Sequence, residues 1–258
     1  MNKLLATAAA LTALATVGTA GAADLPYKAP PMTVAAPSYS WTGCWVSGGV
    51  GYGLWNQEHF AEDSVTRAPL TPTTNSGGEG WLGRVGGGCD YQFTPSFVIG
   101  AFADYDFMNL KGQFQETFSG LIGTEKESAA WAVGARLGYV ALPGLLTFVN
   151  GGYTQARFDG IGLSTNSVPS FPTPFTIGSN TYSGWFVGGG TEYALSWFPV
   201  RGLFWKTEYR YASYRAADIT IEPLAITGTS ENMQKNVQTV TSSLVWRFNW
   251  AGPVVAKY

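Results

Sequence analysis

Charged residues are scarce in this sequence, and so are the residue types that usually build catalytic or metal sites. Charged side chains make up 12% of the 258 residues, about half the usual share, and the formal net charge is −2. The chain has one histidine and two cysteines. Without a basic excess, nothing indicates a nucleic-acid partner. Without a Ser-His-Asp set or a metal-ligand motif, we expect no enzymatic activity, no metal and no cofactor.

Long apolar runs are missing as well, except at the start of the chain. Beyond residue 22 no segment approaches 18 uninterrupted apolar residues, so we expect no transmembrane helix. Residues 1–22 have an early lysine, an apolar run from Leu4 to Val17 and small residues at 20–22. These are the three parts of a secretory signal peptide. We therefore expect the mature chain to leave the cytoplasm.

Glycine and aromatic residues are abundant, with 33 Gly, 10 Trp, 13 Tyr and 15 Phe. Residues 23–40 are rich in proline and lack periodicity, which indicates an extended periplasmic linker. From 41 to about 250, segments of about ten residues alternate between apolar and polar side chains, and turn-forming residues separate them. We expect residues 251–258 to be a short C-terminal tail.

The alternating segments predict eight β-strands. The clearest is 204–214, where Trp205 and Tyr209 lie on one face and Glu208 lies on the other. The segment 145–158 alternates poorly, so its facing stays open. The eight segments are 44–55, 80–93, 97–110, 130–139, 145–158, 184–195, 204–214 and 237–248.

Short and long connections alternate along the chain. The short ones are near 94–96, 141–144 and 196–202, and the long ones are near 56–79, 112–127, 159–182 and 215–235. Short turns on one side and long loops on the other, with an even strand number, are typical of outer-membrane barrels. We therefore predict an all-β fold, an eight-stranded antiparallel transmembrane β-barrel that inserts into the cell outer membrane as a monomer.

The facing of the strands follows from the composition of each face. A soluble barrel of the lipocalin type would turn its apolar face inward. Here the polar face is mostly Gly, Ser and Ala, which an exposed strand disfavours. The apolar face carries Trp and Tyr near the strand ends, as a membrane girdle does. We therefore expect the apolar faces to contact lipid and the polar faces to fill the interior.

Ten charged residues then point into the barrel. Buried charges are stable only when they are paired and hydrogen-bonded, so we predict an interior salt-bridge network rather than a general acid and base. An eight-stranded barrel is filled by its side chains, and a narrow or gated pore is the alternative. The basic residues are Arg84, Arg136, Lys206, Arg210 and Arg247, and the acidic ones are Asp90, Asp104, Asp106, Glu192 and Glu208.

Two smaller predictions concern cysteine and histidine. Centring the first hairpin on its loop places Cys44 opposite Cys89, and an exported chain meets oxidising conditions, so we predict a disulfide. His59 falls in the first long loop beside Glu58 and Glu62. We expect it to be solvated, and a metal or haem role is the weaker alternative.

Several segments together resemble a known family. They are AADLPYKAP at 22–30, WTGCWVSGGVGYG at 41–53, VIGAFADYDF at 98–107, GWFVGGGTEYAL at 184–195, KTEYRY at 206–211 and LVWRFNWAGPVVAKY at 244–258. The chain is similar to the small eight-stranded outer-membrane barrels of alphaproteobacteria, porin-like surface antigens related in form to OmpA and OmpX.

The resemblance implies a role in envelope integrity, surface contact and antigenicity, with adhesion or haem binding in some members. It also implies that the outer-membrane insertion machinery recognises the last strand, where Trp246 and Phe248 match the terminal aromatic pattern. The implied partners are outer-membrane lipid, that machinery, and host or surface ligands of the loops.

Overall fold

The computed structural model describes residues 40–223 and 228–248, and this part of the chain is built of β-strands. The predicted signal peptide, the predicted linker up to residue 39 and the predicted tail lie outside the described residues. Among the residues described, none forms a helix long and apolar enough to cross a membrane. The strands are β1 (Gly43–Asp63), β2 (Thr74–Gln92), β3 (Phe97–Gln115), β4 (Ile122–Leu142), β5 (Leu145–Phe158), β6 (Ile161–Ser164), β7 (Pro172–Ile177), β8 (Asn180–Ala194), β9 (Leu203–Tyr214), β10 (Ala217–Glu222) and β11 (Thr229–Phe248).

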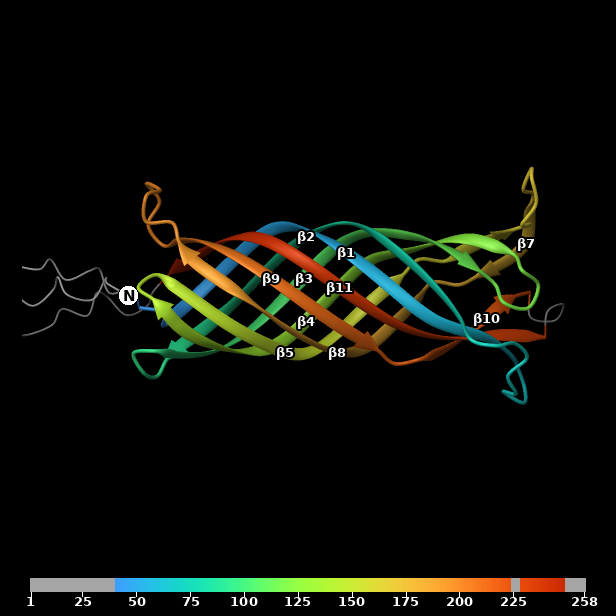
Figure 1. Ribbon diagram of the computed structural model, residues 1–258, viewed down its shortest axis with the longest axis horizontal. Coiled ribbons are helices and arrows are strands. Elements are labelled where there is room, and N and C mark those ends of the chain that lie inside the picture. The colour runs from blue at the N-terminus through green and yellow to red at the C-terminus, as the bar shows by residue number, and fades with distance from the viewer. Residues whose placement is uncertain (1–39, 224–227, 249–258) are drawn as a thin grey trace, which may run out of the picture. The chain divides into compact units, whose positions relative to one another are not determined.

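Eight long strands form a closed antiparallel ring (Figure 1). They pair in the order β1-β2-β3-β4-β5-β8-β9-β11, and β11 pairs back with β1 from Cys44↔Phe248 to Asp63↔Thr229. Closure leaves none of these strands with an open hydrogen-bonding edge along the ring. The eight-stranded antiparallel barrel predicted from the sequence is confirmed.

The three short strands extend this ring at the end of the long connections. The pairs Phe158↔Asn180 of β5 and β8 and Ile161↔Ile177 of β6 and β7 keep one register. β10 continues β9 and pairs with both β7 and β11. The short strands are therefore continuations of β5, β8 and β9 beyond local breaks.

The prediction of long loops at 56–79, 112–127, 159–182 and 215–235 is wrong over much of these ranges. Strands occupy most of these residues, and three of the remaining connections are only 64–73, 116–121 and 165–171. The reason is that inward and outward residues still alternate in these segments but both faces are polar, so the sequence shows no difference in polarity between the two faces.

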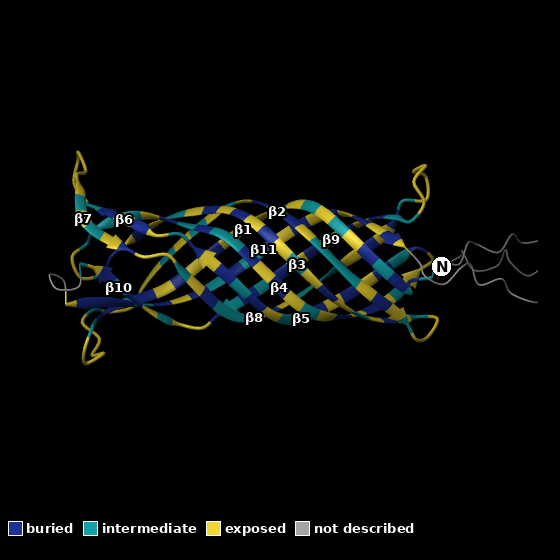
Figure 2. Ribbon diagram, turned by 180° about the vertical axis from the view of Figure 1, so that it is seen from behind, coloured by how far each residue is buried: buried dark blue, intermediate teal, exposed yellow. Residues whose placement is uncertain are grey.

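Buried and exposed residues alternate along the long strands (Figure 2), as expected for side chains that point alternately into the barrel and out of it. On β9, Lys206 and Glu208 are buried, whereas Trp205 and Tyr209 are 53% and 46% exposed. The facing of β5, which the sequence leaves open, is now clear. Leu146 points inward with Phe148 and Asn150, and Val149 and Tyr153 point outward.

The outward apolar side chains form a belt around the barrel, here called the apolar belt. At its upper edge, toward the long connections, polar groups of the aromatic residues are hydrogen-bonded to neighbouring strands. The Tyr211 hydroxyl donates to Asn236 Oδ1 at 3.0 Å, and Trp131 Nε1 donates to Gln155 Oε1 at 3.2 Å. Aromatic residues with one apolar side and one hydrated end are typical of a membrane interface. The belt includes Val50, Leu54, Trp81, Val85, Ile99, Tyr105, Phe107, Trp131, Val133, Leu137, Val149, Tyr153, Trp185, Val187, Tyr193, Trp205, Tyr209, Tyr211, Val240, Leu244 and Trp246.

Inward glycines make room for large rings. A Cβ atom at Gly134 would lie 2.8 Å from Phe186 Cζ and 2.5 Å from the carbonyl oxygen of Gly151. At Gly152 it would lie 3.0 Å from Phe186 Cε1. Phe186 is 2% exposed, so its ring occupies the space that these side chains would need. Glycine at these two positions therefore leaves room for the Phe186 ring, because the interior of an eight-stranded barrel is narrow.

We expect Gly134→Ala to destabilise the barrel by about 1–3 kcal/mol, because the added methyl group overpacks against a backbone oxygen and the Phe186 ring. The matched control is Gly48→Ala, since a Cβ atom at Gly48 has no other atom within 4 Å. Urea unfolding in detergent micelles, followed by tryptophan fluorescence, measures both variants. Equal midpoints for the two would contradict this account of the packing.

Candidate functional site

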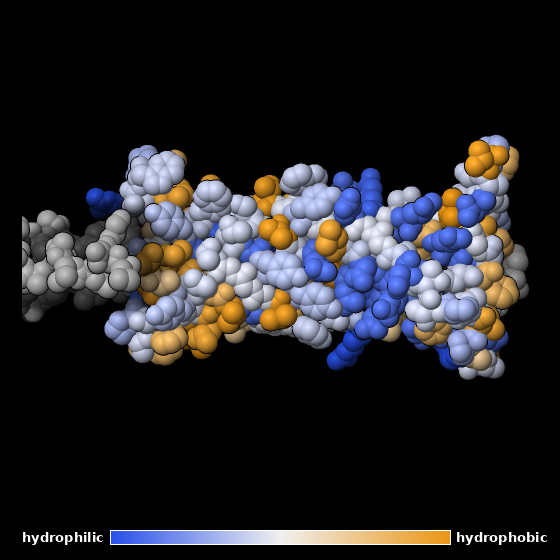
Figure 3. Space-filling model, in the orientation of Figure 1, coloured by the Kyte–Doolittle hydropathy of each residue, from blue (hydrophilic) through white to orange (hydrophobic). Residues whose placement is uncertain are grey.

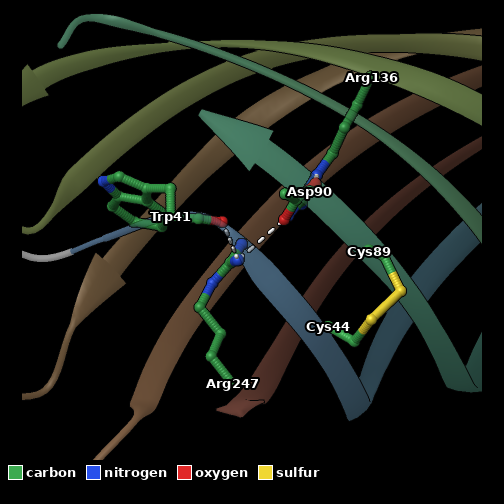
Figure 4. Close-up of a disulfide and its surroundings, with 6 residues drawn as sticks. All are labelled: Trp41, Cys44, Cys89, Asp90, Arg136 and Arg247. Carbon is green, nitrogen blue, oxygen red and sulfur yellow. Dashed lines mark hydrogen bonds and ion pairs between the residues drawn. A yellow bond between two sulfur atoms is a disulfide. The ribbon is translucent and has the colours of Figure 1, made fainter. Parts of the chain in front are cut away.

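Four inward charges near the short-turn end form a closed ring of ion pairs. Arg247 Nε donates to Glu192 Oε1 at 2.6 Å, and Arg247 Nη1 donates to Asp90 Oδ2 at 2.8 Å. Arg136 Nε donates to Asp90 Oδ1 at 2.8 Å, and Arg136 Nη1 donates to Glu192 Oε2 at 3.2 Å. Figure 4 shows Arg136 and Arg247 meeting at Asp90. Each arginine therefore bridges both carboxylates.

Two tryptophans cover this ring of charges. The Arg136 guanidinium lies 4.7 Å from the centre of the Trp45 ring, and the Arg247 guanidinium lies 4.8 Å from that of Trp41. Arg247 Nη1 also donates to the Trp41 carbonyl oxygen at 3.4 Å. Both rings are buried. This role of the two tryptophans is not among the predictions from the sequence, although Trp45 has the inward parity of its strand.

A second cluster of charges lies midway along the barrel. Arg84 binds Asp106 with two hydrogen bonds of 2.7 and 2.8 Å. Arg210 binds Asp104 with two more, of 2.9 and 2.7 Å. Glu208 Oε1 accepts from Arg210 Nη2 at 2.8 Å and from Arg84 Nη1 at 3.4 Å. Bidentate pairs of this kind are strong and fix the orientation of both partners.

Lys206 connects the two clusters. Its Nζ lies 3.5 Å from Glu208 Oε2 and 4.9 Å from the centre of the Trp45 ring. The structure thus brings all ten predicted charges into one continuous interior. A cavity beside Arg84 and Tyr214 has a volume of about 10 Å³, room for no more than one water molecule. At this level the barrel is filled by protein atoms.

A third polar group, which alternation did not predict, lies nearer the long connections. Lys235 Nζ donates to Glu125 Oε1 at 2.5 Å and to Gln57. It also lies 4.2 Å from the centre of the Phe158 ring and 5.0 Å from that of Tyr182. Gln57 and Lys235 keep the parity of the inward residues on β1 and β11. That continued parity is the signal that could have placed them inside.

The expectation that His59 is a solvated loop residue is wrong. His59 lies in β1 and is 0% exposed, and its Nδ1 is 3.2 Å from Glu231 Oε2. Glu231 Oε1 accepts from the backbone and side chain of Thr117 at 2.9 and 2.8 Å. The physical reason is that β1 runs on to Asp63 with His59 at an inward position. The pair therefore ties the β3–β4 turn to β11.

The first connection is also fixed by charge. Arg67 Nη1 donates to Glu62 Oε1 at 2.6 Å and lies 3.4 Å from Asp218 Oδ2. The hydrogen bond to Glu62 raises the pKa of the Arg67 guanidinium. Arg67 thus joins the connection after β1 to β10.

The remaining predicted residues lie on the outer surface. A disulfide joins Cys44 to Cys89, which are register partners on β1 and β2 near the short turns (Figure 4). Trp246 and Phe248 are 51% and 37% exposed on β11, with ring centres 5.4 Å apart. Recognition of this last strand by the insertion machinery remains a prediction.

Comparisons with known proteins agree with this geometry. Residues 7–248 match the family model described as the outer membrane protein beta-barrel domain. The 31 kDa outer-membrane immunogenic proteins of Brucella melitensis and Brucella suis are each 28% identical to this chain over 196 residues, which is 74% of this chain and 79% of theirs. The crystal structure of OprG from Pseudomonas aeruginosa, at 10% identity, covers 81% of this chain and 97% of its own with a TM-score of 0.50. At that identity the likeness concerns the fold.

We expect Glu192→Leu to destabilise the barrel by about 3 kcal/mol or more, because it leaves Arg136 and Arg247 buried with one acidic partner in place of two. The matched control is Glu58→Leu, since Glu58 is exposed on the outer surface of β1. The free energy of unfolding in detergent, from urea titration, checks both. Indistinguishable values for the two variants would count against the network.

Proposed function

The chain belongs to the outer membrane protein beta-barrel family and lies in the cell outer membrane, and from this premise we propose that it is a structural and surface-interaction protein. The connections 64–73, 116–121 and 165–171, at the end of the barrel opposite the short turns, carry the interaction, in the manner of an antigen or adhesin. The observation that carries the proposal is a barrel whose middle is packed with paired charges while one end presents exposed apolar side chains.

The packed interior favours this role over that of a narrow or gated pore. Ten charged side chains from several strands occupy the bore. The interior cavity beside Arg84 has room for no more than one water molecule. Eight strands enclose a space that side chains fill, whereas aqueous channels are found in larger barrels. We therefore propose that the outer surfaces, and not the bore, carry the function.

The exposed end supports contact with a partner. Val65, Phe118, Val168 and Phe171 are 86, 60, 103 and 59% exposed and come from three connections. A single exposed apolar residue is ordinary, but these four lie at the same end of the barrel. The ion pair of Arg67 and the hydrogen bonds of Thr117 hold two of these connections in place. Loops that a rigid scaffold positions are common binding elements.

The Brucella relatives are named as immunogenic outer-membrane proteins, which agrees with exposure of this end at the cell surface.

The other candidate roles have less support. Within the described part of the chain, no three His, Cys, Asp or Glu side chains are grouped as metal ligands. A haem ligand at His59 would have to displace Phe114 and Glu231. We propose a non-enzymatic role.

We expect the quadruple variant with Val65, Phe118, Val168 and Phe171 changed to serine to reduce adhesion by about tenfold or more, because apolar contacts at the centre of an interface carry much of the affinity. The assay is attachment of bacteria that display the protein to cultured epithelial cells. The matched control changes Trp197 and Phe198 to serine, since these residues are 75 and 42% exposed at the opposite end. Equal attachment of both variants and the parent would refute the proposal.

A further inference from the structure

Basic side chains lie on one half of the outer surface, just beyond the apolar belt. They are Lys111 on β3, Lys126 on β4, Arg157 on β5 and Arg215 after β9, and we call them the basic collar. On the other half of the ring, β1 and β2 carry exposed Glu58 and Glu79 at this level, and β11 carries Gln234 and Asn236. Figure 3 shows a hydrophilic band between the belt and the loop end.

The collar residues lie at a similar distance along the chain from the belt. Lys111 and Arg157 each lie four residues beyond the last belt residue of their own strand, which is Phe107 or Tyr153, and Arg215 lies four residues beyond Tyr211, the last belt residue of β9. Lys126 lies five residues from Trp131. At about 3.3 Å per residue and a tilt of roughly 40°, this places the collar on the order of 10 Å above the belt. That is the depth of lipid headgroups beside the hydrocarbon core.

The collar charges are only partly neutralised by the protein. Lys111 and Lys126 are register partners, and like charges directly opposite each other are destabilising. Lys126 lies 3.9 Å from Asp159, and Glu79 is the register partner of Lys111 on its other side. Within 40–223 and 228–248, no ion pair forms at Lys111, Arg157 or Arg215. An anion from outside would relieve this repulsion.

A hollow beside Arg215 has the shape and chemistry for an amphipathic ligand. Its volume is about 530 Å³, and Tyr153 and Trp185 of the belt line it together with Ser183 and Arg215. It lies where the pairing of β8 with β9 ends at Gly184↔Tyr214. Aromatic rings thus face the hydrocarbon side of the hollow, and a guanidinium lies on the headgroup side.

We infer that the basic collar binds the phosphate groups of a phosphorylated lipid in the outer leaflet, with Arg215 above the hollow and the acyl chains along the apolar belt. Guanidinium groups recognise phosphate with paired hydrogen bonds, and lysines attract it as point charges. Basic side chains next to a membrane are attracted to anionic lipid in the same way. The inference depends on membrane location and not on the proposed loop function.

The test is a titration of the full, refolded protein in a neutral maltoside detergent with diphosphorylated lipid A, followed by isothermal calorimetry. We expect Lys111→Gln with Lys126→Gln, and separately Arg157→Gln with Arg215→Gln, to weaken binding by about 25-fold each, or about fivefold per basic residue. Arg157→Lys with Arg215→Lys keeps the charges and should retain most of the affinity. The matched control Arg201→Gln, exposed at the short-turn end, should change it less than twofold.

Three results would overturn the inference. The first is unchanged affinity in both glutamine double variants, with folding checked by the electrophoretic shift of the unheated barrel. The second is equal binding of lipid A from which the phosphates have been removed, because the belt alone would then explain it. The third is displacement of the lipid by an equal concentration of inorganic phosphate, which would indicate a site for a free anion.

Discussion

Pairing of inward charges across a narrow, closed bore is the interaction on which the rest of the structure depends. Ring closure fixes the width, and buried charges inside it are stable when they are paired and hydrogen-bonded. Asp90, Arg136, Glu192 and Arg247 come from four strands, so their ring of hydrogen bonds holds those strands in one register. The glycines around Phe186 follow from the same limit on space.

A filled bore moves the functional surfaces to the outside of the barrel. The apolar belt meets lipid, and the three connections with exposed apolar side chains lie beyond it at the long-connection end. Charged residues near the long-connection end hold these connections in place. The His59–Glu231 pair holds the β3–β4 turn through Thr117, and Arg67 joins the first connection to β10. The interior thus acts as a rigid support for the surfaces that we propose to be functional.

Prediction from the sequence succeeds where the two faces of a strand differ in polarity. Within the belt this contrast is strong, so strand number, facing and the ten inward charges follow from alternation. Beyond the belt both faces meet polar surroundings, and the contrast is lost. The sequence therefore places Lys235 and His59 in predicted loops, although they keep the inward parity of β11 and β1. Trp41 was missed because it precedes the first strand, outside any alternating pattern.

The measurement that tests the central claim most directly is single-channel conductance of the refolded, purified protein in a planar bilayer. The account predicts no steady openings from protein shown to be folded, because paired side chains fill the bore. A double variant with Arg136→Ala and Glu192→Ala removes two of these side chains and serves as the comparison. Reproducible openings of the parent protein, as large as those of the double variant, would mean that the charged interior is a hydrated path and would contradict the account.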